Sequence, residues 1–186
     1  MNSKQQAAAQ TRTHLVEAAI NTLRQHGAHH LTLDAVAKAS AISKGGLLHH
    51  FPTKEALIEA LLRQLLTEYE QQVQGFYERE SQGVGRWLRA YVRATFAAED
   101  SLSMELLVML LSAITEYPNL LRLVQTDHRA WEARLSSDGL PLARVRAIRM
   151  AADSYWQERL MGIGVSNPEE RYLVLNELLN WVEAAI

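Results

Sequence analysis

The chain of 186 residues contains no cysteine and no long apolar run. The absence of cysteine excludes disulfide bonds and the usual cysteine-rich zinc sites, although sites built from histidine and carboxylates stay open. The most apolar stretch, residues 106–114, is far too short to cross a bilayer. The amino terminus also lacks the apolar core of a signal peptide. We therefore expect a soluble, cytoplasmic protein.

The chain also lacks a strong net charge and any familiar catalytic motif. With a net charge of -2 it carries no global basic field, so a nucleic-acid partner must be bound by a local patch. G-x-S-x-G, a phosphate-binding P-loop and H-E-x-x-H do not occur, and His128, Glu99 and Asp100 have no nucleophile or base at a suggestive spacing. We expect neither an enzyme nor a cofactor.

Alternating β-branched runs are almost absent, whereas apolar residues recur at spacings of three and four, which predicts an all-α chain of about nine helices. A glycine and a polar break end the first and fourth helices, at Gly27 and residues 78–85. The residues before Ala8 are rich in alanine and glutamine and are expected to form a frayed tail. The expected helices span residues 8–26, 33–40, 44–51, the stretch from 54 to about 78, 86–99, 102–116, 119–135, 141–161 and 168–185.

Two short helices joined by a tight turn follow the first long helix. Thr32 and Ser43 are typical N-caps for them, and Pro52 ends the second. This order is typical of a helix-turn-helix, whose second helix enters the major groove of DNA. Gly45 and Gly46 each weaken that helix by roughly 1 kcal/mol relative to alanine. Close approach of the backbone to phosphates or base edges would account for them.

The side chains of the second short helix divide into two faces. Lys44 can reach a guanine edge or a phosphate, His49 can donate to phosphate or base, and Lys54 is available for the DNA backbone. Leu47 and Phe51, four residues apart, are expected to face inward and dock this helix on the first. This division of faces is what a DNA-reading helix requires.

Two other interpretations of the same residues exist. Gly45 and Gly46 can instead allow close packing between helices, and His49 and His50 can lie on a solvated surface. A metal site is conceivable from two histidine groups, but adjacent histidines on a helix point about 100 degrees apart and chelate poorly. No paired carboxylates accompany them, so we expect no metal. These groups are His26, His29 and His30, and His49 with His50.

The stretch "LTLDAVAKASAISKGGLLHHFPTKEALIEALL", residues 31–62, closely resembles the DNA-binding signature of the TetR family of transcriptional regulators. The resemblance covers about the first 65 residues. It implies that Thr32 and Lys54 hold phosphates. It also implies a group of residues at or near the major groove, namely Ser43, Lys44, Gly45, Gly46 and His49.

Two positions depart from the family pattern. Ala41 replaces the usual turn glycine, which we expect to matter little because alanine fits many such turns. Leu48 replaces the usual aromatic residue and so removes an expected hydrogen bond to phosphate or sugar. Either His49 takes over that work or Leu48 contacts a thymine methyl group.

The resemblance implies a DNA-binding domain at residues 8–53 and a helical effector-binding and dimerisation domain at 54–186. The last helix carries two apolar stripes, which suggests that it is covered both by its own domain and by a partner. With the helix around residues 150–161 it is a candidate four-helix dimer interface, although both stripes could instead be plain core. The stripes are Tyr172, Leu175, Leu179 and Val182, and Val174, Leu178 and Trp181.

Aromatic and thioether side chains in the second domain are suited to an adaptable ligand pocket, although such residues are often plain core. Asp153 lies in the otherwise apolar stretch "MAADSYW" and needs a partner: Arg149, water, or, least favoured, a cationic ligand. The candidate pocket residues are Trp87, Tyr91, Met104, Met109, Trp131, Met150, Asp153 and Trp156.

The sequence thus predicts a ligand-responsive regulator, a repressor that binds a palindromic operator as a homodimer and is released by a small-molecule effector. Two reading helices at about 34 to 36 Å would contact both half-sites. The alternative is a helical interaction or sensor protein of the same fold that has lost operator binding, for which Leu48 is the one hint.

Overall fold

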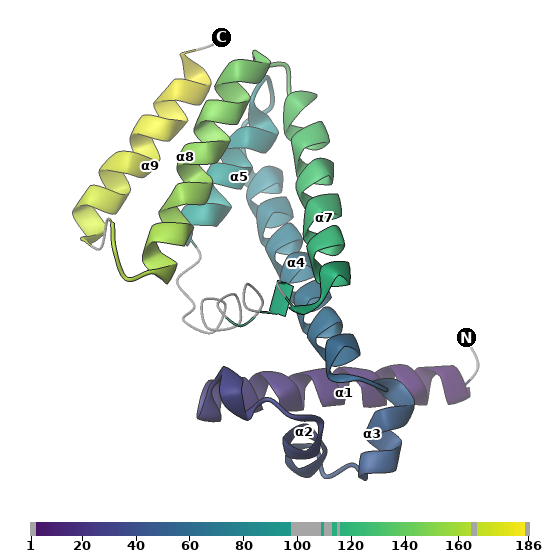
Figure 1. Cartoon of the computed structure of the whole chain (residues 1–186). Coiled ribbons are helices and arrows are strands. Elements are labelled where there is room, and N and C mark those ends of the chain that lie inside the picture. The colour runs from purple at the N-terminus through teal and green to yellow at the C-terminus, as the bar shows by residue number, and fades with distance from the viewer. Residues whose placement is uncertain (1–2, 98–108, 110–112, 115, 165–166, 185–186) are drawn as a thin grey trace. The chain divides into compact units, whose positions relative to one another are not determined.

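The structure is a computed structural model that describes residues 3–97, 109, 113–114, 116–164 and 167–184 (Figure 1). In these ranges all regular elements are helical, which confirms the predicted all-α fold. Eight α-helices are described, close to the nine predicted, and most of the expected helix 102–116 lies outside the described residues. The elements are α1 (Ser3–His26), the 3-10 turn η1 (Ala28–His30), α2 (Leu33–Ala39), α3 (Lys44–His50), α4 (Lys54–Arg79), α5 (Arg86–Ala97), α7 (Pro118–Ser136), α8 (Leu142–Leu160) and α9 (Pro168–Glu183).

The expected frayed tail is wrong, because α1 is already helical at Ser3. Alanine and glutamine are good helix formers, so the exposed start of α1 is favourable even without packing. At its other end Gly27 adopts a φ of 78 degrees and its amide donates to Leu23 O at 2.8 Å, as predicted for a glycine that ends a helix.

The chain divides into two compact units, residues 1–65 with 101–121, and residues 66–100 with 122–186. In the first unit, leucines of α1, α3 and α4 are fully buried with Phe51. Burial of each such side chain stabilises the fold by about 1.5–3 kcal/mol. These residues are Leu15, Leu23, Leu47, Leu57 and Leu61.

The second unit packs α5 against α8 and α9, with α7 contributing to the same core (Figure 1). Its core is mostly aliphatic, with aromatic residues from α5, α7 and α8 at one side. The fully buried aliphatic residues include Val73, Leu88, Val92, Leu135, Ile148 and Val182.

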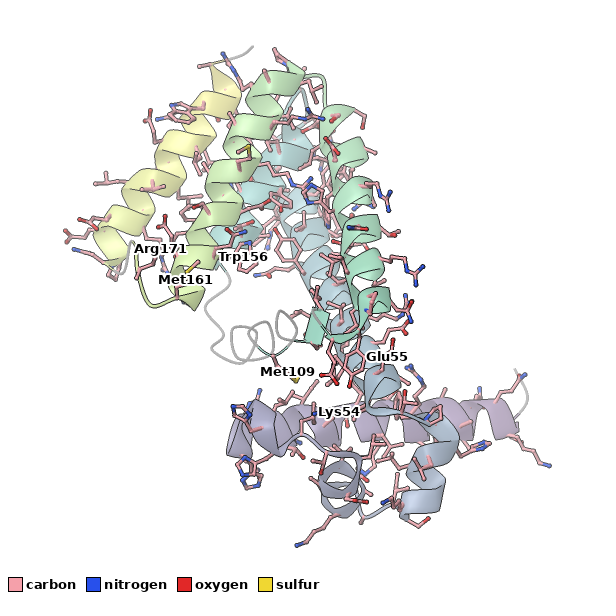
Figure 2. All side chains as sticks on the ribbon, viewed as in Figure 1. Lys54, Glu55, Met109, Trp156, Met161 and Arg171 are labelled. Carbon is pink, nitrogen blue, oxygen red and sulfur yellow. The ribbon has the colours of Figure 1, made fainter. Side chains whose placement is uncertain are left out.

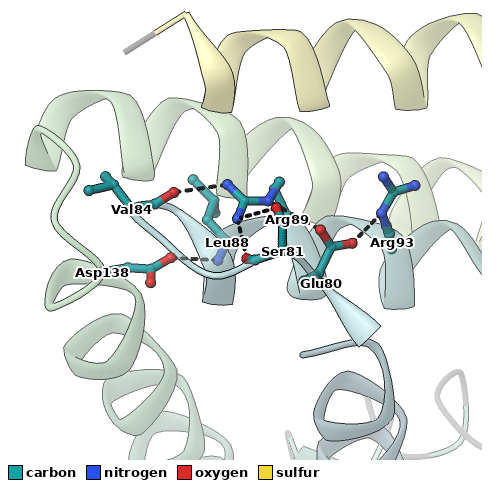
Figure 3. Close-up of polar contacts among 7 residues, drawn as sticks. All are labelled: Glu80, Ser81, Val84, Leu88, Arg89, Arg93 and Asp138. Carbon is teal, nitrogen blue, oxygen red and sulfur yellow. Dashed lines mark hydrogen bonds and ion pairs between the residues drawn. The ribbon is translucent and has the colours of Figure 1, made fainter. Parts of the chain in front are cut away.

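A buried arginine joins α5 to the end of α4 and the loop that follows it (Figure 3). Arg89 is only 4% exposed; its Nε donates to Glu80 Oε2 at 3.2 Å and its Nη atoms donate to Val84 O at 2.8 Å and Ser81 O at 3.0 Å. Arg93 donates to the other oxygen of the same carboxylate. The buried charge is therefore paired and hydrogen-bonded, as its desolvation requires.

Asp138 in the α7–α8 loop closes the amino end of α5 (Figure 3). Its Oδ2 accepts from Leu88 N at 2.9 Å, and its carbonyl accepts from Gly85 N at 2.9 Å. Burial raises the pKa of this carboxyl, while hydrogen bonds from the backbone of Leu88 and Trp87 oppose the shift. A residue 50 positions away thus supplies the cap that the sequence around α5 lacks.

Within the described ranges, no helix combines the length and apolar character that a membrane span requires.

Candidate nucleic-acid interface and effector cluster

Side-chain caps define both short helices of the first unit. Thr32 Oγ1 accepts from Ala35 N at 3.1 Å at the start of α2, and Ser43 Oγ accepts from Gly46 N at 3.1 Å at the start of α3. Thr53 caps α4 in the same way, accepting from Ala56 N at 3.1 Å. The caps predicted at Thr32 and Ser43 are confirmed, and α2 and α3 end within one residue of the predicted positions.

The turn between α2 and α3 is strained at Ala41, whose φ of 55 degrees lies in the left-handed region. Among the described residues it is the one non-glycine with a positive φ. The turn forms with alanine in place of glycine, although an L-residue in this conformation costs roughly 1–2 kcal/mol.

A histidine of α1 holds this turn from the other side. His14 Nε2 donates to Ser40 O at 3.0 Å, and the buried Ser40 hydroxyl donates to Ala37 O at 3.1 Å. Sequence reasoning missed His14, because its partner lies 26 positions away and no local pattern marks it. The turn that orients α3 is therefore fixed by α1 as well as by its own residues.

The two predicted faces of α3 are present. Leu47 and Phe51 are 0% and 1% exposed, whereas every residue assigned to DNA is at least partly exposed. Leu48 is 37% exposed, so its side chain is available to a partner. The assigned residues are Thr32, Ser43, Lys44, Gly45, Gly46, Leu48, His49 and Lys54, the last labelled at the start of α4 in Figure 2.

The two glycines of α3 differ in their surroundings. A Cβ on Gly46 would lie 3.0 Å from Ile42 Cγ2 and 3.3 Å from the capping hydroxyl of Ser43, so local packing accounts for this glycine. A Cβ on Gly45 would meet nothing within 4 Å. Of the two glycines, only Gly45 is therefore not explained by packing among the described residues.

The charges of residues 1–65, which include the two short helices, favour an anionic partner. Residues 1–65 carry seven Lys or Arg and four Asp or Glu, although the whole chain has a net charge of -2. Lys44 Nζ lies 2.8 Å from Asp34 Oδ1, and both side chains are exposed. His49 and His50 pack edge to face with ring centroids 5.4 Å apart. In the described part of the chain, no group of three or more His, Cys, Asp or Glu is arranged to hold a metal ion.

In the second unit, Asp153 belongs to a polar cluster that links α5, α7 and α8. The Tyr91 hydroxyl donates to Asp153 Oδ1 at 2.6 Å, and Arg149 Nε lies 3.5 Å from Asp153 Oδ2. Arg149 Nη2 donates to His128 Nδ1 at 3.0 Å. Of the three partners considered for Asp153, the structure supplies Arg149, and it adds Tyr91, which lies 62 positions away and was missed.

Burial dominates the protonation of this cluster. It raises the pKa of Asp153, while the hydrogen bond from Tyr91 and the charge of Arg149 oppose the shift. Burial also raises the pKa of Tyr69 and Tyr91 well above the ordinary value. The Thr95 hydroxyl donates to Tyr91 O at 2.9 Å, so Tyr69 donates its proton to Thr95 at 2.7 Å. Both phenols are neutral hydrogen-bond donors.

Aromatic rings surround the polar cluster. Trp131 packs edge to face against Tyr69 and Tyr91, with centroids 6.0 Å and 5.4 Å apart. Trp87 instead stacks on Tyr77 at 3.8 Å, and Trp156 is partly buried near the end of α8 (Figure 2). We call the set Tyr69, Tyr91, His128, Trp131, Arg149 and Asp153 the effector cluster.

Some candidate pocket residues do not join this cluster. Met150 is 71% exposed, because α8 turns it away from the core, so it does not belong to this cluster. Met109 is buried but belongs to the first unit, and Met104 lies outside the described residues. A surface hollow of about 560 Å³ lies elsewhere, between α1 and α2, and is lined in part by His14 and Lys38.

The two predicted stripes of α9 regroup in the structure. In the first stripe, Leu179 and Val182 are buried but Tyr172 is 64% exposed. In the second stripe, Leu178 is 3% exposed and packs in the same core. Each predicted stripe therefore places some residues in the core and leaves others exposed. Large apolar side chains of α8 and α9 stay exposed: Met150, Met161, Tyr172, Leu173, Val174 and Trp181.

Comparison with known proteins agrees with this architecture. Residues 15–61 match the family "Bacterial regulatory proteins, tetR family", and residues 85–183 match "Tetracyclin repressor-like, C-terminal domain". The transcriptional regulator UidR of Escherichia coli K12 is 36% identical over 81 residues, 41% of each chain. The chain thus aligns with about two fifths of the length of this curated relative.

Solved structures share the fold along nearly the whole chain. A TetR transcription regulator from Haloarcula marismortui has a TM-score of 0.78 at 15% identity, covering 95% of this chain and 98% of its own. The multidrug binding protein EbrR, solved with malachite green, has a TM-score of 0.66 at 19% identity, covering 92% and 97%. The matched families and UidR are transcriptional regulators and not enzymes, in agreement with the sequence prediction. The chain belongs to the TetR family of bacterial regulatory proteins.

Proposed function

We propose that the chain is a ligand-responsive transcriptional repressor that binds a palindromic DNA operator as a homodimer and is released by a small-molecule effector. In this proposal residues 8–53 bind DNA, and residues 54–186 bind the effector and form the dimer. A protein that binds chromosomal DNA acts in the cytoplasm, which we propose as its location.

The observation that carries the DNA-binding half is the exposed reading face of α3. Its cap is formed, its core side is buried through Leu47 and Phe51, and Lys44, Gly45 and His49 stand outside. We propose that Lys44 and His49 contact the major groove. Thr32 and Lys54, both exposed at helix starts, would contact phosphates on either side.

The homodimer is supported by the apolar face that α8 and α9 leave uncovered. Met150, Leu173 and Trp181 are 71%, 66% and 46% exposed, although large apolar patches are rare on a lone subunit. A second copy of the two helices would cover this face and form a four-helix interface. One reading helix supplies little specificity, whereas a dimer reads two half-sites.

The effector is supported by the chemistry of the effector cluster. Aromatic surface lies next to Asp153, whose ion-pair partner Arg149 sits at 3.5 Å. A ligand with an aromatic body and a polar group could replace the Tyr91 or Arg149 contact to this carboxylate. Such a change would act on α5, α7 and α8 together, because the cluster has members on all three.

The experiment for the DNA-binding half is a selection with the purified protein from a duplex library with a randomised core, followed by binding measurements in increasing salt. Affinity for the selected sequence should fall steeply with salt, and Lys44→Ala should weaken it. Arg129→Ala is the matched control, since it removes one exposed positive charge from α7 in the second unit. If no sequence is enriched, the alternative of a family member without operator binding holds instead.

The effector half is tested by thermal-shift screening of small molecules against the wild-type protein and Asp153→Asn. A ligand present at 100 times its Kd stabilises the folded state by about 2.7 kcal/mol, which a melting curve resolves. The proposal expects a hit whose stabilisation shrinks in the variant. A hit that stabilises both proteins equally would place the effector elsewhere.

A further inference from the structure

Asp34 is an unexpected residue beside the reading helix. It lies in the first turn of α2, and its Oδ1 is 2.8 Å from Nζ of Lys44, the first residue of α3. Side-chain exposures of 61% for Lys44 and 71% for Asp34 mean that water surrounds the pair, so it contributes little to stability. An acidic group next to DNA phosphates weakens binding unless it makes a contact of its own.

The edge of a G·C base pair in the major groove has the complementary pattern. Guanine presents the acceptors N7 and O6, and its partner cytosine presents the N4 amino donor. O6 and N4 are hydrogen-bonded to each other, so they lie about 2.9 Å apart. This spacing matches the 2.8 Å between the Lys44 ammonium and the Asp34 carboxylate.

We propose that Asp34 and Lys44 together read one G·C base pair in each half-site, which rests on the DNA-binding function proposed above. The Lys44 ammonium donates to guanine, and the Asp34 carboxylate accepts from the amino group of the paired cytosine. Asp34 is thereby a specificity-determining residue that stands on α2, outside the reading helix itself.

The pair also rejects the wrong base. When A·T replaces G·C, the adenine amino group faces the ammonium and thymine O4 faces the carboxylate, so a donor meets a donor and an acceptor meets an acceptor. Lys44 alone would tolerate this exchange better, because adenine keeps the N7 acceptor. The discrimination between G·C and A·T at this position therefore depends on Asp34.

The test measures base preference with the full-length protein. After selection of an operator, each G·C pair is changed symmetrically to A·T, and affinities are compared for wild type, Asp34→Ala and Asp34→Asn. In the wild type one such change should cost about tenfold or more in affinity. In Asp34→Ala, the ratio of the affinities for the G·C and A·T operators should fall toward one at the base pair that Asp34 and Lys44 contact, and at no other. Asp34→Asn, whose amide can donate to thymine O4, should shift the preference at this base pair toward A·T.

The matched control is Glu59→Gln, which removes one acidic partner of an exposed ion pair, Glu59 with Arg63 at 2.7 Å, from the same unit. It should leave all base preferences unchanged. If Asp34→Ala raises affinity for every duplex by the same factor and alters no ratio, Asp34 only repels phosphate and the inference is overturned while the repressor proposal stands. If wild type enriches no sequence, both fall together.

Discussion

Replacing Ala41 with glycine should stabilise the first unit. Ala41 has a φ of 55 degrees, and an L-residue pays roughly 1–2 kcal/mol to adopt this conformation. Glycine adopts it at no steric cost but loses more backbone entropy on folding, which offsets about 0.5–1 kcal/mol of the gain. The expected net stabilisation is therefore roughly 0.5–1 kcal/mol.

The assay must follow the first unit by itself. All four tryptophans lie in the second unit, so tryptophan fluorescence would report the wrong transition. Hydrogen exchange of peptides that cover residues 33–50 reports α2 and α3 directly. Ala41→Gly should slow their exchange about two- to fivefold, the factor that corresponds to the expected free energy.

A matched control lies two residues earlier. Ala39 is the last residue of α2 and is exposed, so Ala39→Gly makes the same chemical change in a helical conformation. It should destabilise by up to about 1 kcal/mol and speed the exchange. The reasoning fails if the two variants change exchange in the same direction, because the sign depends only on the backbone conformation at each position.

Three further predictions concern other features. Gly46→Ala should destabilise α3 through the close contacts described above, whereas Gly45→Ala should stabilise it by up to about 1 kcal/mol yet weaken DNA binding; hydrogen exchange and binding isotherms together check this pair. Arg89→Met should lower the free energy of unfolding by about 1–3 kcal/mol, because Glu80 keeps only Arg93 as a partner and the carbonyls of Ser81 and Val84 lose their donor; an unchanged urea midpoint by tryptophan fluorescence would contradict it. Because burial raises the pKa of Asp153 in the folded protein, its contribution to stability is full below the ordinary pKa of 3.8 and is lost as the pH rises through the raised value. The free energy of unfolding, measured at a series of acidic pH values, should therefore fall less with rising pH in Asp153→Asn than in the wild type.

Much of the first unit could be predicted from the sequence because its signals are local. A cap forms between residues three apart, so Thr32 and Ser43 were recognisable as caps. The inward side of α3 followed from the spacing of Leu47 and Phe51 alone.

Only the tertiary structure decided the contacts between residues distant in sequence. The contacts of His14 with Ser40, of Asp138 with Leu88 and of Asp153 with Tyr91 join residues 26, 50 and 62 positions apart, and no local pattern in the sequence indicates them. The exposure of Met150 and Tyr172 also could not be predicted from the sequence, because it depends on how α8 and α9 pack. Periodicity shows that a helix has an apolar side, but the rotation of that helix against its neighbours determines which residues the core buries.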